Sequence, residues 1–268
     1  MEHIFLLCAA KPHRQADSRL VARIRTAAAQ TGALCLIREC RRPGDIASVI
    51  CRDAARGGAM RFYVCGSDAD LCAAARVASG FSNAEIGIIP DARGCDFAHS
   101  YPHADFSSPL AQLRATPRAV DMIDCNGQRF LSSVRICSPG TLSRAGGQLS
   151  PPVSLAAACD DGSLLTGAFV VAAVGNSAYS GRKTLFRYAD PSDGQLDLTL
   201  QRSLPPRGTA AFIRKQFRRL TLIPHQPLYV CGDGQNFRAL RLSFTAVPGC
   251  VRFLIPAART HHLPIQLT

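Results

Sequence analysis

The sequence lacks any long apolar segment. No stretch approaches the run of about 18 apolar residues that a membrane-spanning helix needs. Its first residues, Met1 to Cys8, place the acid Glu2 where a secretory signal peptide carries a positive charge. We therefore expect a cytoplasmic protein, and we expect any membrane contact to be peripheral, at the inner membrane face.

Cysteine pairs are also missing. The 268 residues include 12 cysteines, but no two have the C-x-x-C spacing typical of zinc and redox sites. Cys35 and Cys40 are the closest pair, and no second pair of ligands accompanies them. Free and mostly buried thiols are therefore favoured over a metal site, and the scattered spacing does not indicate a disulfide framework.

Lysine and acidic residues are scarce. Only three of the 31 basic residues are lysine, and 19 acids leave a net charge of +12. A basic surface favours acidic partners such as nucleotides, anionic lipids or nucleic acid, and composition does not choose among them. The hydrophobic content of 47% is enough for a buried core in each of two domains.

The first part of the chain alternates short apolar runs with helical patterns, which is typical of βαβ units around a mainly parallel sheet. Serine, proline and glycine stand where the helices are expected to begin and end. Strands are predicted at 3–8, 33–37, 61–64 and 86–89, and helices at 18–32, 43–57 and 70–79.

After about residue 101 the pattern changes to strand-sized segments separated by turns, which indicates an antiparallel β-sandwich. One helix is expected at Thr209–Leu220, and a long loop at 138–152. We predict an α/β nucleotide-binding domain at 1–101 and a sandwich domain at 102–268 whose last residues return to the first domain. Sandwich strands are predicted at 120–124, 128–136, 153–158, 164–174, 196–201, 228–231, 240–245 and 251–255.

Two short segments each follow a predicted strand and open a helix. They are 64–71 (VCGSDADL) and 89–98 (IPDARGCDFA). Such junctions bind phosphate because free backbone N–H groups at the start of a helix point at the anion. Taken singly, a plain turn between strand and helix explains each segment better than a nucleotide site does.

Taken in order, the two segments resemble motifs of the diacylglycerol kinase family, G-G-D-G-T-x-x-E and I-P-x-G-T-G-N-D-F-A. Three later segments extend the resemblance across nearly the whole chain. They are 176–181 (NSAYSG), similar to N-G-x-Y-x-G-G, 188–197 (YADPSDGQLD), similar to A-x-x-D-D-G-x-L-D, and 231–235 (CGDGQ), similar to x-x-D-G-E. The resemblance implies the NAD kinase/diacylglycerol kinase-like fold, with the active site between an α/β domain and an antiparallel β-sandwich.

The resemblance also implies chemistry. In this family ATP, with Mg²⁺, phosphorylates a lipid hydroxyl such as that of diacylglycerol, and no nucleic acid takes part. The catalytic positions that match are Asp68 and Asp233, the nucleotide-binding positions are Gly66, Ser67, Asp68, Gly94 and Asp96, and the Mg²⁺ positions are Asp190, Asp193 and Gln195. A helix cap is an equally good interpretation of Asp70 and Asp96.

Several family residues are replaced. The N-P-x-x-G loop reads Cys8-Ala9-Ala10-Lys11-Pro12, and the second signature has Ala92, Arg93 and Cys95 in place of glycine, threonine and asparagine. The first signature has lost two glycines, a threonine and a glutamate, at Ser67, Ala69, Asp70 and Ala73. Ser192 replaces an acid that the resemblance makes the general base or its close helper, and Gln235 replaces the final glutamate.

Asp70 brings a negative charge to the phosphate position. Like charges about 4 Å apart repel by about 4 kcal/mol at an effective dielectric near 20. A micromolar-to-millimolar nucleotide site has only about 4 to 8 kcal/mol of affinity in total. Asp70 also stands where its carboxylate can cap its own helix in the anion's place. Several such changes together are enough to remove ATP binding.

Two hypotheses follow. The first is a diacylglycerol kinase-like lipid kinase of weak activity, and the second is a catalytically silent paralogue that binds a lipid, a nucleotide or a protein partner. An NAD kinase-like activity is a third. Residues 212–220 carry apolar and basic faces suited to an anionic membrane, although a helix packed on the sandwich explains them better. A homodimer is a further expectation.

Overall fold

The computed structural model describes residues 1–8, 18–91, 95–138, 151–180, 183–202 and 212–258. Hydrogen bonds connect fifteen strands of these ranges into one sheet, and a separate two-stranded ribbon lies beside it. The N-terminal part of this sheet is parallel and the C-terminal part is antiparallel, as predicted. Within the described ranges, no helix has the length and apolar character needed to cross a membrane.

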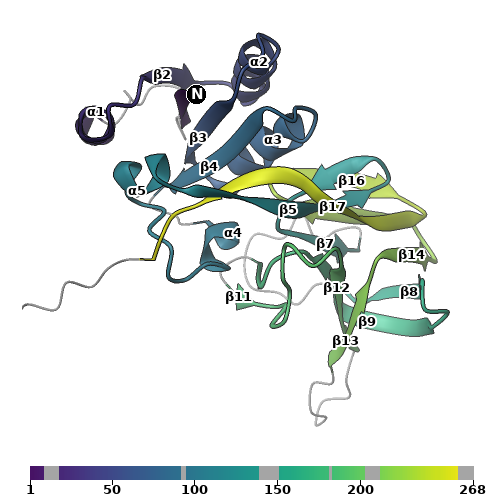
Figure 1. The fold of residues 1–268 in the computed structure, drawn as a ribbon. Helices are drawn as coiled ribbons and strands as arrows, with labels where there is room; N and C mark the ends of the chain where they lie inside the picture. Colours follow the sequence, from purple (N-terminus) through teal and green to yellow (C-terminus); the bar gives the residue numbers. More distant parts are fainter. Residues whose placement is uncertain (9–17, 92–94, 139–150, 181–182, 203–211, 259–268) are drawn as a thin grey trace, which may run out of the picture.

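The N-terminal half has the predicted βαβ order. Its four strands are parallel neighbours in the order β2-β1-β3-β4, with helices on both faces (Figure 1). Alternate residues of β1 enter different cores, because Ile4 and Leu6 pack with α2 and α3 whereas Phe5 and Leu7 pack with α1 and α5. The elements are β1 (Glu2–Cys8), α1 (Ser18–Thr31), β2 (Cys35–Cys40), α2 (Pro43–Ala54), β3 (Met60–Gly66), α3 (Asp68–Ala78) and β4 (Ala84–Pro90), followed by two short helices, α4 (Asp96–His99), which starts within the segment 89–98 expected to open a helix, and the unpredicted α5 (Pro109–Leu113).

The C-terminal half is antiparallel. Its strands run in the order β16-β15-β7-β9-β8-β14-β17, and β12 pairs with both β9 and β13. They enclose a second apolar core. The strands are β5 (Thr116–Cys125), β6 (Gln128–Phe130), β7 (Ser133–Cys137), β8 (Val153–Cys159), β9 (Leu164–Gly175), β10 (Tyr179–Ser180), β11 (Lys183–Thr184), β12 (Leu196–Arg202), β13 (Phe212–Phe217), β14 (Arg219–Pro224), β15 (Leu228–Gly232), β16 (Gln235–Ala239) and β17 (Leu242–Ile255).

Strand β17 belongs to both halves. It is parallel to β4 at Arg252 and Phe253, and antiparallel to β5 and β14. In Figure 1 its yellow ribbon runs across the middle of the molecule. The register between β17 and β5 shifts between Val247 and Val251. Such a bulge bends a strand, and the bend lets β17 pair with strands of both halves. The two predicted strands at 240–245 and 251–255 are therefore one, while the domain boundary at residue 101 stays a prediction.

The helix predicted at Thr209–Leu220 is wrong. Residues 212–217 form β13 and residues 219–224 form β14, while 209–211 lie outside the described residues. Burial alternates along β13 with a period of two, because the strand pairs with β12 and turns every second side chain outward. An amphipathic helix with one basic face therefore does not exist here, and the membrane contact that depended on it is withdrawn.

Buried Glu85 of β4 ties three strands together. Its Oε2 accepts a hydrogen bond from Arg61 Nε of β3 at 2.9 Å, and its Oε1 pairs with Arg252 Nη2 of β17. Arg61 also donates to the carbonyls of Leu113 and Ala115. Removing one member of a buried ion network leaves a desolvated charge behind, which is costly.

We expect Glu85→Gln to lower the free energy of unfolding by about 2 to 3 kcal/mol, because Arg61 loses its counter-ion. Urea unfolding followed by circular dichroism measures this change. Glu39→Gln is the control, since the Glu39–Arg41 pair is largely exposed and is expected to contribute under about 1 kcal/mol. Equal losses in the two variants would contradict a structural role for the Glu85 network.

Candidate functional site

The two predicted phosphate loops open at the same edge of the sheet. Gly66 and Pro90, the last residues of β3 and β4, are register partners, and Asp91 N–H donates to the Gly66 carbonyl at 2.9 Å. Ligands of open α/β sheets bind at the carboxyl ends of parallel strands. Gly94 lies outside the described residues.

Asp70 caps its own helix. Ser67, the N-cap of α3, donates its N–H and its hydroxyl to Asp70 Oδ2 at 2.9 and 2.7 Å, and Asp70 N–H donates back to Ser67 Oγ. A β-carbon at Gly66 would lie 2.6 Å from the same Asp70 oxygen. The carboxylate therefore fills the space at the start of α3, where the sequence predicted a phosphate, and the capping interpretation of Asp70 is confirmed.

Asp68 connects the two loops. Its Oδ1 accepts a hydrogen bond from the Cys95 thiol at 2.8 Å, and its Oδ2 accepts one from Asp96 N–H at 3.0 Å. Burial and the Asp68 charge hold the pKa of Cys95 well above its usual range, so this thiol stays a donor. Two predicted site residues, Asp68 and Asp96, thus lie together at the start of α4.

Asp233 enters the same place from the C-terminal half. It stands with Gly234 in the two-residue turn between β15 and β16, at φ values of 46° and 76°. Its Oδ2 accepts hydrogen bonds from the N–H groups of Leu131 and Ser132 at 2.6 and 3.0 Å. Burial, reinforced by the Asp68 charge, raises the pKa of Asp233 to about 6. The carboxylates of Asp68 and Asp233 are therefore electrostatic neighbours.

The tip of this turn lies against α3. A β-carbon at Gly234 would come within 2.5 Å of the Ala69 side chain. Ala69 stands where the family motif has glycine, so its methyl group takes up space at the contact. Only glycine fits opposite it, because the turn also requires a positive φ.

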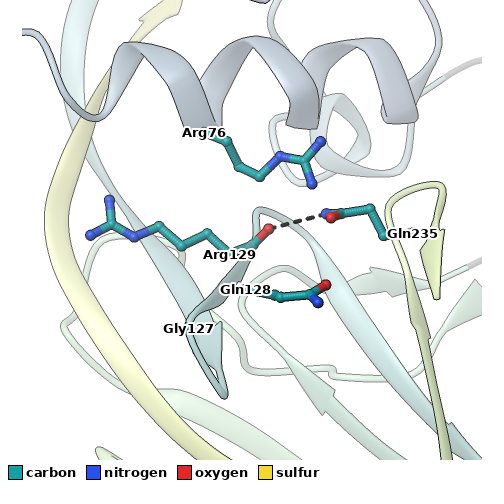
Figure 2. A pocket seen from close by; sticks show the side chains of 5 residues that line it. All are labelled: Arg76, Gly127, Gln128, Arg129 and Gln235. Carbon is teal, nitrogen blue, oxygen red and sulfur yellow. Dashed lines mark hydrogen bonds between the residues drawn. The ribbon is translucent and has the colours of Figure 1, made fainter. Parts of the chain in front are cut away.

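Gln235 faces a pocket of about 350 Å³ lined by Arg76, Gly127, Gln128 and Arg129. Figure 2 shows the Arg76 guanidinium reaching from α3 toward Gln235, while the Arg129 guanidinium points away, where it donates to Ser79. Gln235 Nε2 donates to the Arg129 carbonyl at 3.3 Å. The residue that replaces the family's final glutamate is thus neutral and is held by the backbone.

The predicted metal residues lie in a turn before β12. Asp190 Oδ1 accepts hydrogen bonds from the N–H and hydroxyl of Ser192, and Asp193 Oδ1 accepts one from Gln195 N–H at 2.8 Å. Burial, followed by the charges of Asp190 and Asp121, raises the pKa of Asp193. Among the described residues, no three or more His, Cys, Asp or Glu side chains are grouped to hold a metal ion. The Mg²⁺ site stays a prediction.

Sequence reasoning missed Asp121. This buried side chain of β5 accepts hydrogen bonds from Gly194 N–H and Gly249 N–H, both at 2.7 Å. It therefore fastens the turn that contains Asp193 to the bulge in β17. The sequence signal that could have revealed Asp121 is an acid inside the apolar run 120–123, because a buried carboxylate needs hydrogen-bond partners.

Asn176 links this turn to the Asp233 neighbourhood. Its Nδ2 donates to the carbonyls of Asp121 and Leu131, at 2.8 and 3.0 Å. Within the described part of the chain, Asn176 Oδ1 and the hydroxyl of Ser177 are buried without a hydrogen-bond partner. Asn176 therefore holds the backbone at Leu131, whose N–H group donates to Asp233.

No family model and no curated protein matches the sequence. Solved structures match the fold of the chain. Three crystal structures from Bacillus anthracis str. Sterne, two of them described as a "putative diacylglycerol kinase" and one as a diacylglycerol kinase, superpose with TM-scores of 0.80, 0.78 and 0.75 at 14% sequence identity. They cover 94 to 95% of this chain, which covers 96 to 97% of theirs. The chain has a diacylglycerol kinase-like fold.

This diacylglycerol kinase-like fold gathers part of the predicted site. Gly66, Ser67, Asp68, Asp96 and Asp233 lie around the starts of α3 and α4. Asp190, Asp193 and Gln195 lie in their own turn, connected to that place through Asp121 and Asn176. The predicted residues thus form two linked groups rather than one cluster.

Proposed function

We propose that this chain is a diacylglycerol kinase-like lipid phosphotransferase with low affinity for nucleotide. The contact of the Asp233–Gly234 turn with Ala69, the neighbour of Asp68, joins the two halves of the chain at these acids and is the observation that carries the proposal. A lipid hydroxyl, such as that of diacylglycerol, is the proposed acceptor. The excess of positive charge supports its recruitment to the anionic inner face of a membrane from the cytoplasm.

Asp233 is the proposed general base. A carboxylate with a pKa of about 6 is mostly ionised at neutral pH, yet it accepts a proton more readily than an ordinary aspartate does. Two backbone N–H groups fix Oδ2, so the carboxylate has one orientation. In the proposed reaction it takes the proton of the lipid hydroxyl. Bound ATP with Mg²⁺ supplies the phosphoryl group and offsets its charge.

The residues at the start of α3 can bind a nucleotide phosphate, but binding there costs free energy. Phosphate takes the start of α3 only when the Asp70 carboxylate turns away, and losing a helix cap costs about 0.5 to 2 kcal/mol. Residual repulsion from Asp70 adds up to about 4 kcal/mol. Mg²⁺ is usually held by one or two carboxylates together with phosphate oxygens and waters, and Asp68 would supply a carboxylate at this place. The proposal is therefore one of weak activity.

The central experiment uses ATP labelled in its γ-phosphate, Mg²⁺, and phosphatidylcholine vesicles containing diacylglycerol. Labelled phosphatidate, formed in proportion to protein, is the expected product. Absence of labelled lipid at millimolar ATP would count against phosphotransfer.

The pH profile gives a second prediction. Because the base works only when ionised, we expect the rate to rise with pH through a midpoint of about 6 and to level off above pH 7. One pH unit below the midpoint, the rate is expected to be about a tenth of its plateau. Initial rates at constant ionic strength and saturating Mg²⁺ measure the profile. A rate that falls between pH 5 and pH 7 would rule Asp233 out as the base.

A specific observation favours the second candidate, a catalytically silent paralogue. Asp70 fills the start of α3, and the Ala69 side chain meets the Asp233 turn. In this reading the fold is kept to bind a lipid, a nucleotide or a protein partner. Calorimetric titration combined with the labelled-lipid assay separates the candidates, because Mg-ATP binding together with labelled phosphatidate supports the kinase, whereas no heat with ATP supports the silent paralogue. A homodimer stays a prediction for sedimentation analysis.

A further inference from the structure

Two thiols meet at the sheet edge beside the site. Cys8 ends β1, Cys40 ends β2, and the two residues are register partners on neighbouring parallel strands. Such strands lie about 4.8 Å apart, which falls within the Cα separation of roughly 4.4 to 6.8 Å found in disulfides. Register partners project to the same face of a sheet, so the two side chains lie next to each other, while the Cys8 thiol donates to the Leu6 carbonyl at 3.5 Å. Both cysteines are free.

The thiol pair adjoins the start of α3. A β-carbon at Gly66 would lie 2.9 Å from the Cys8 β-carbon, and the Asp70 charge acts on both thiols. Cys8 is half-buried and Cys40 is 4% exposed, so a small oxidant reaches them more easily than a protein partner does.

The two thiols are unequal. Their interaction lowers the pKa of Cys40, against the opposing effects of burial and of the Asp45 and Asp70 charges, and it raises the pKa of Cys8. Burial also raises the pKa of Cys8. A cysteine with a lowered pKa beside a second thiol that keeps its proton suits the roles of a peroxide-reactive cysteine and its resolving partner.

We propose that Cys8 and Cys40 form a reversible disulfide when a hydroperoxide oxidises the protein. The Cys40 thiolate attacks the O–O bond, gains OH as a sulfenic acid, and releases an alkoxide or hydroxide that is protonated. Cys8 then attacks the Cys40 sulfur, the S–S bond forms, and water leaves with the Cys8 proton. The two thiols lose two electrons and the hydroperoxide gains them. A dithiol reverses the reaction by exchange.

A second thiol pair provides the matched control. Cys137 and Cys231 also influence each other's pKa, on the neighbouring strands β7 and β15, but they are not register partners, because Cys137 faces Tyr229 and Cys231 faces Arg135. Diagonal neighbours on antiparallel strands are roughly 7 to 8 Å apart, outside the range for a disulfide. This pair is expected to stay reduced under conditions that join Cys8 to Cys40.

The test treats the reduced full-length chain with one equivalent of hydrogen peroxide, then alkylates it in denaturant and maps the peptides by mass spectrometry. We expect a cross-linked Cys8–Cys40 peptide pair, lighter by two hydrogen atoms and lost on treatment with dithiothreitol. In Cys8→Ser, dimedone is expected to label Cys40, whereas in Cys40→Ser it leaves Cys8 unlabelled. Full alkylation of Cys8 and Cys40, or equal cross-linking of Cys137 to Cys231, would overturn the proposal. The wild-type peptide map decides even where a serine variant fails to fold.

Discussion

Replacing Asp233 by asparagine is expected to lower the phosphotransfer rate by about 100- to 10,000-fold, the usual contribution of a general base. Asparagine has the same shape, and its oxygen can still accept the hydrogen bonds from Leu131 and Ser132 that position the side chain. It cannot take a proton from a lipid hydroxyl. The measurement is the initial rate of labelled phosphatidate formation on vesicles, with the affinity for Mg-ATP followed in parallel.

Asp160 offers a matched control for this variant. Its Oδ2 also accepts hydrogen bonds from two consecutive backbone N–H groups, those of Arg218 and Arg219, at 3.0 and 3.1 Å. Asp160→Asn therefore makes the same chemical change in an exposed turn at the end of β8, and the rate is expected to stay unchanged. If the two asparagine variants lost activity equally, the loss would reflect stability rather than proton transfer.

Replacing Asp70 by threonine, the residue of the family motif, is expected to raise the affinity for Mg-ATP on the order of 100-fold. This corresponds to about 2.7 kcal/mol, which lies within the repulsion of up to about 4 kcal/mol between like charges 4 Å apart. The change also frees the Ser67 N–H group, which in the parent chain donates to the Asp70 carboxylate. Isothermal titration calorimetry measures the effect.

The control for Asp70→Thr is Asp45→Thr at the start of α2. Asp45 Oδ2 accepts hydrogen bonds from the N–H groups of Arg41 and Arg42, so this variant also removes a capping carboxylate. Its affinity for Mg-ATP is expected to match that of the parent chain. An unchanged affinity in Asp70→Thr would show that the Asp70 charge does not limit nucleotide binding, and the silent paralogue would then need another explanation.

The N-terminal half was predictable because its signals are local. Strands covered on both faces read as continuous apolar runs, and Ser67 followed three residues later by Asp70 is a capping pattern visible in the sequence. The same locality explains why the Asp70 cap was anticipated. The order of five family-like segments added the arrangement of the two halves, which composition and periodicity alone do not reveal.

The features that were not predicted depend on pairing between segments that are distant in the sequence. The apolar positions Ile213, Phe217 and Leu220 suit a helix, but Phe217 and Ile213 suit a strand equally well once β12 is there to pair with. Asp121 was not predicted because its partners, Gly194 and Gly249, are 73 and 128 residues away. A buried acid reveals its partners only when distant segments are brought together.

The position of β17 has a consequence for how the chain folds during its synthesis. This strand fills a central place between β4 and β5, and Arg252 reaches Glu85 across 167 residues of sequence. The ribosome delivers it after the other strands described here. Until then the parallel sheet has a bare inner edge, open to pairing with a foreign strand. We therefore expect nascent chains that end before residue 242 to depend on chaperones, and the sheet to be completed only once β17 has been synthesised.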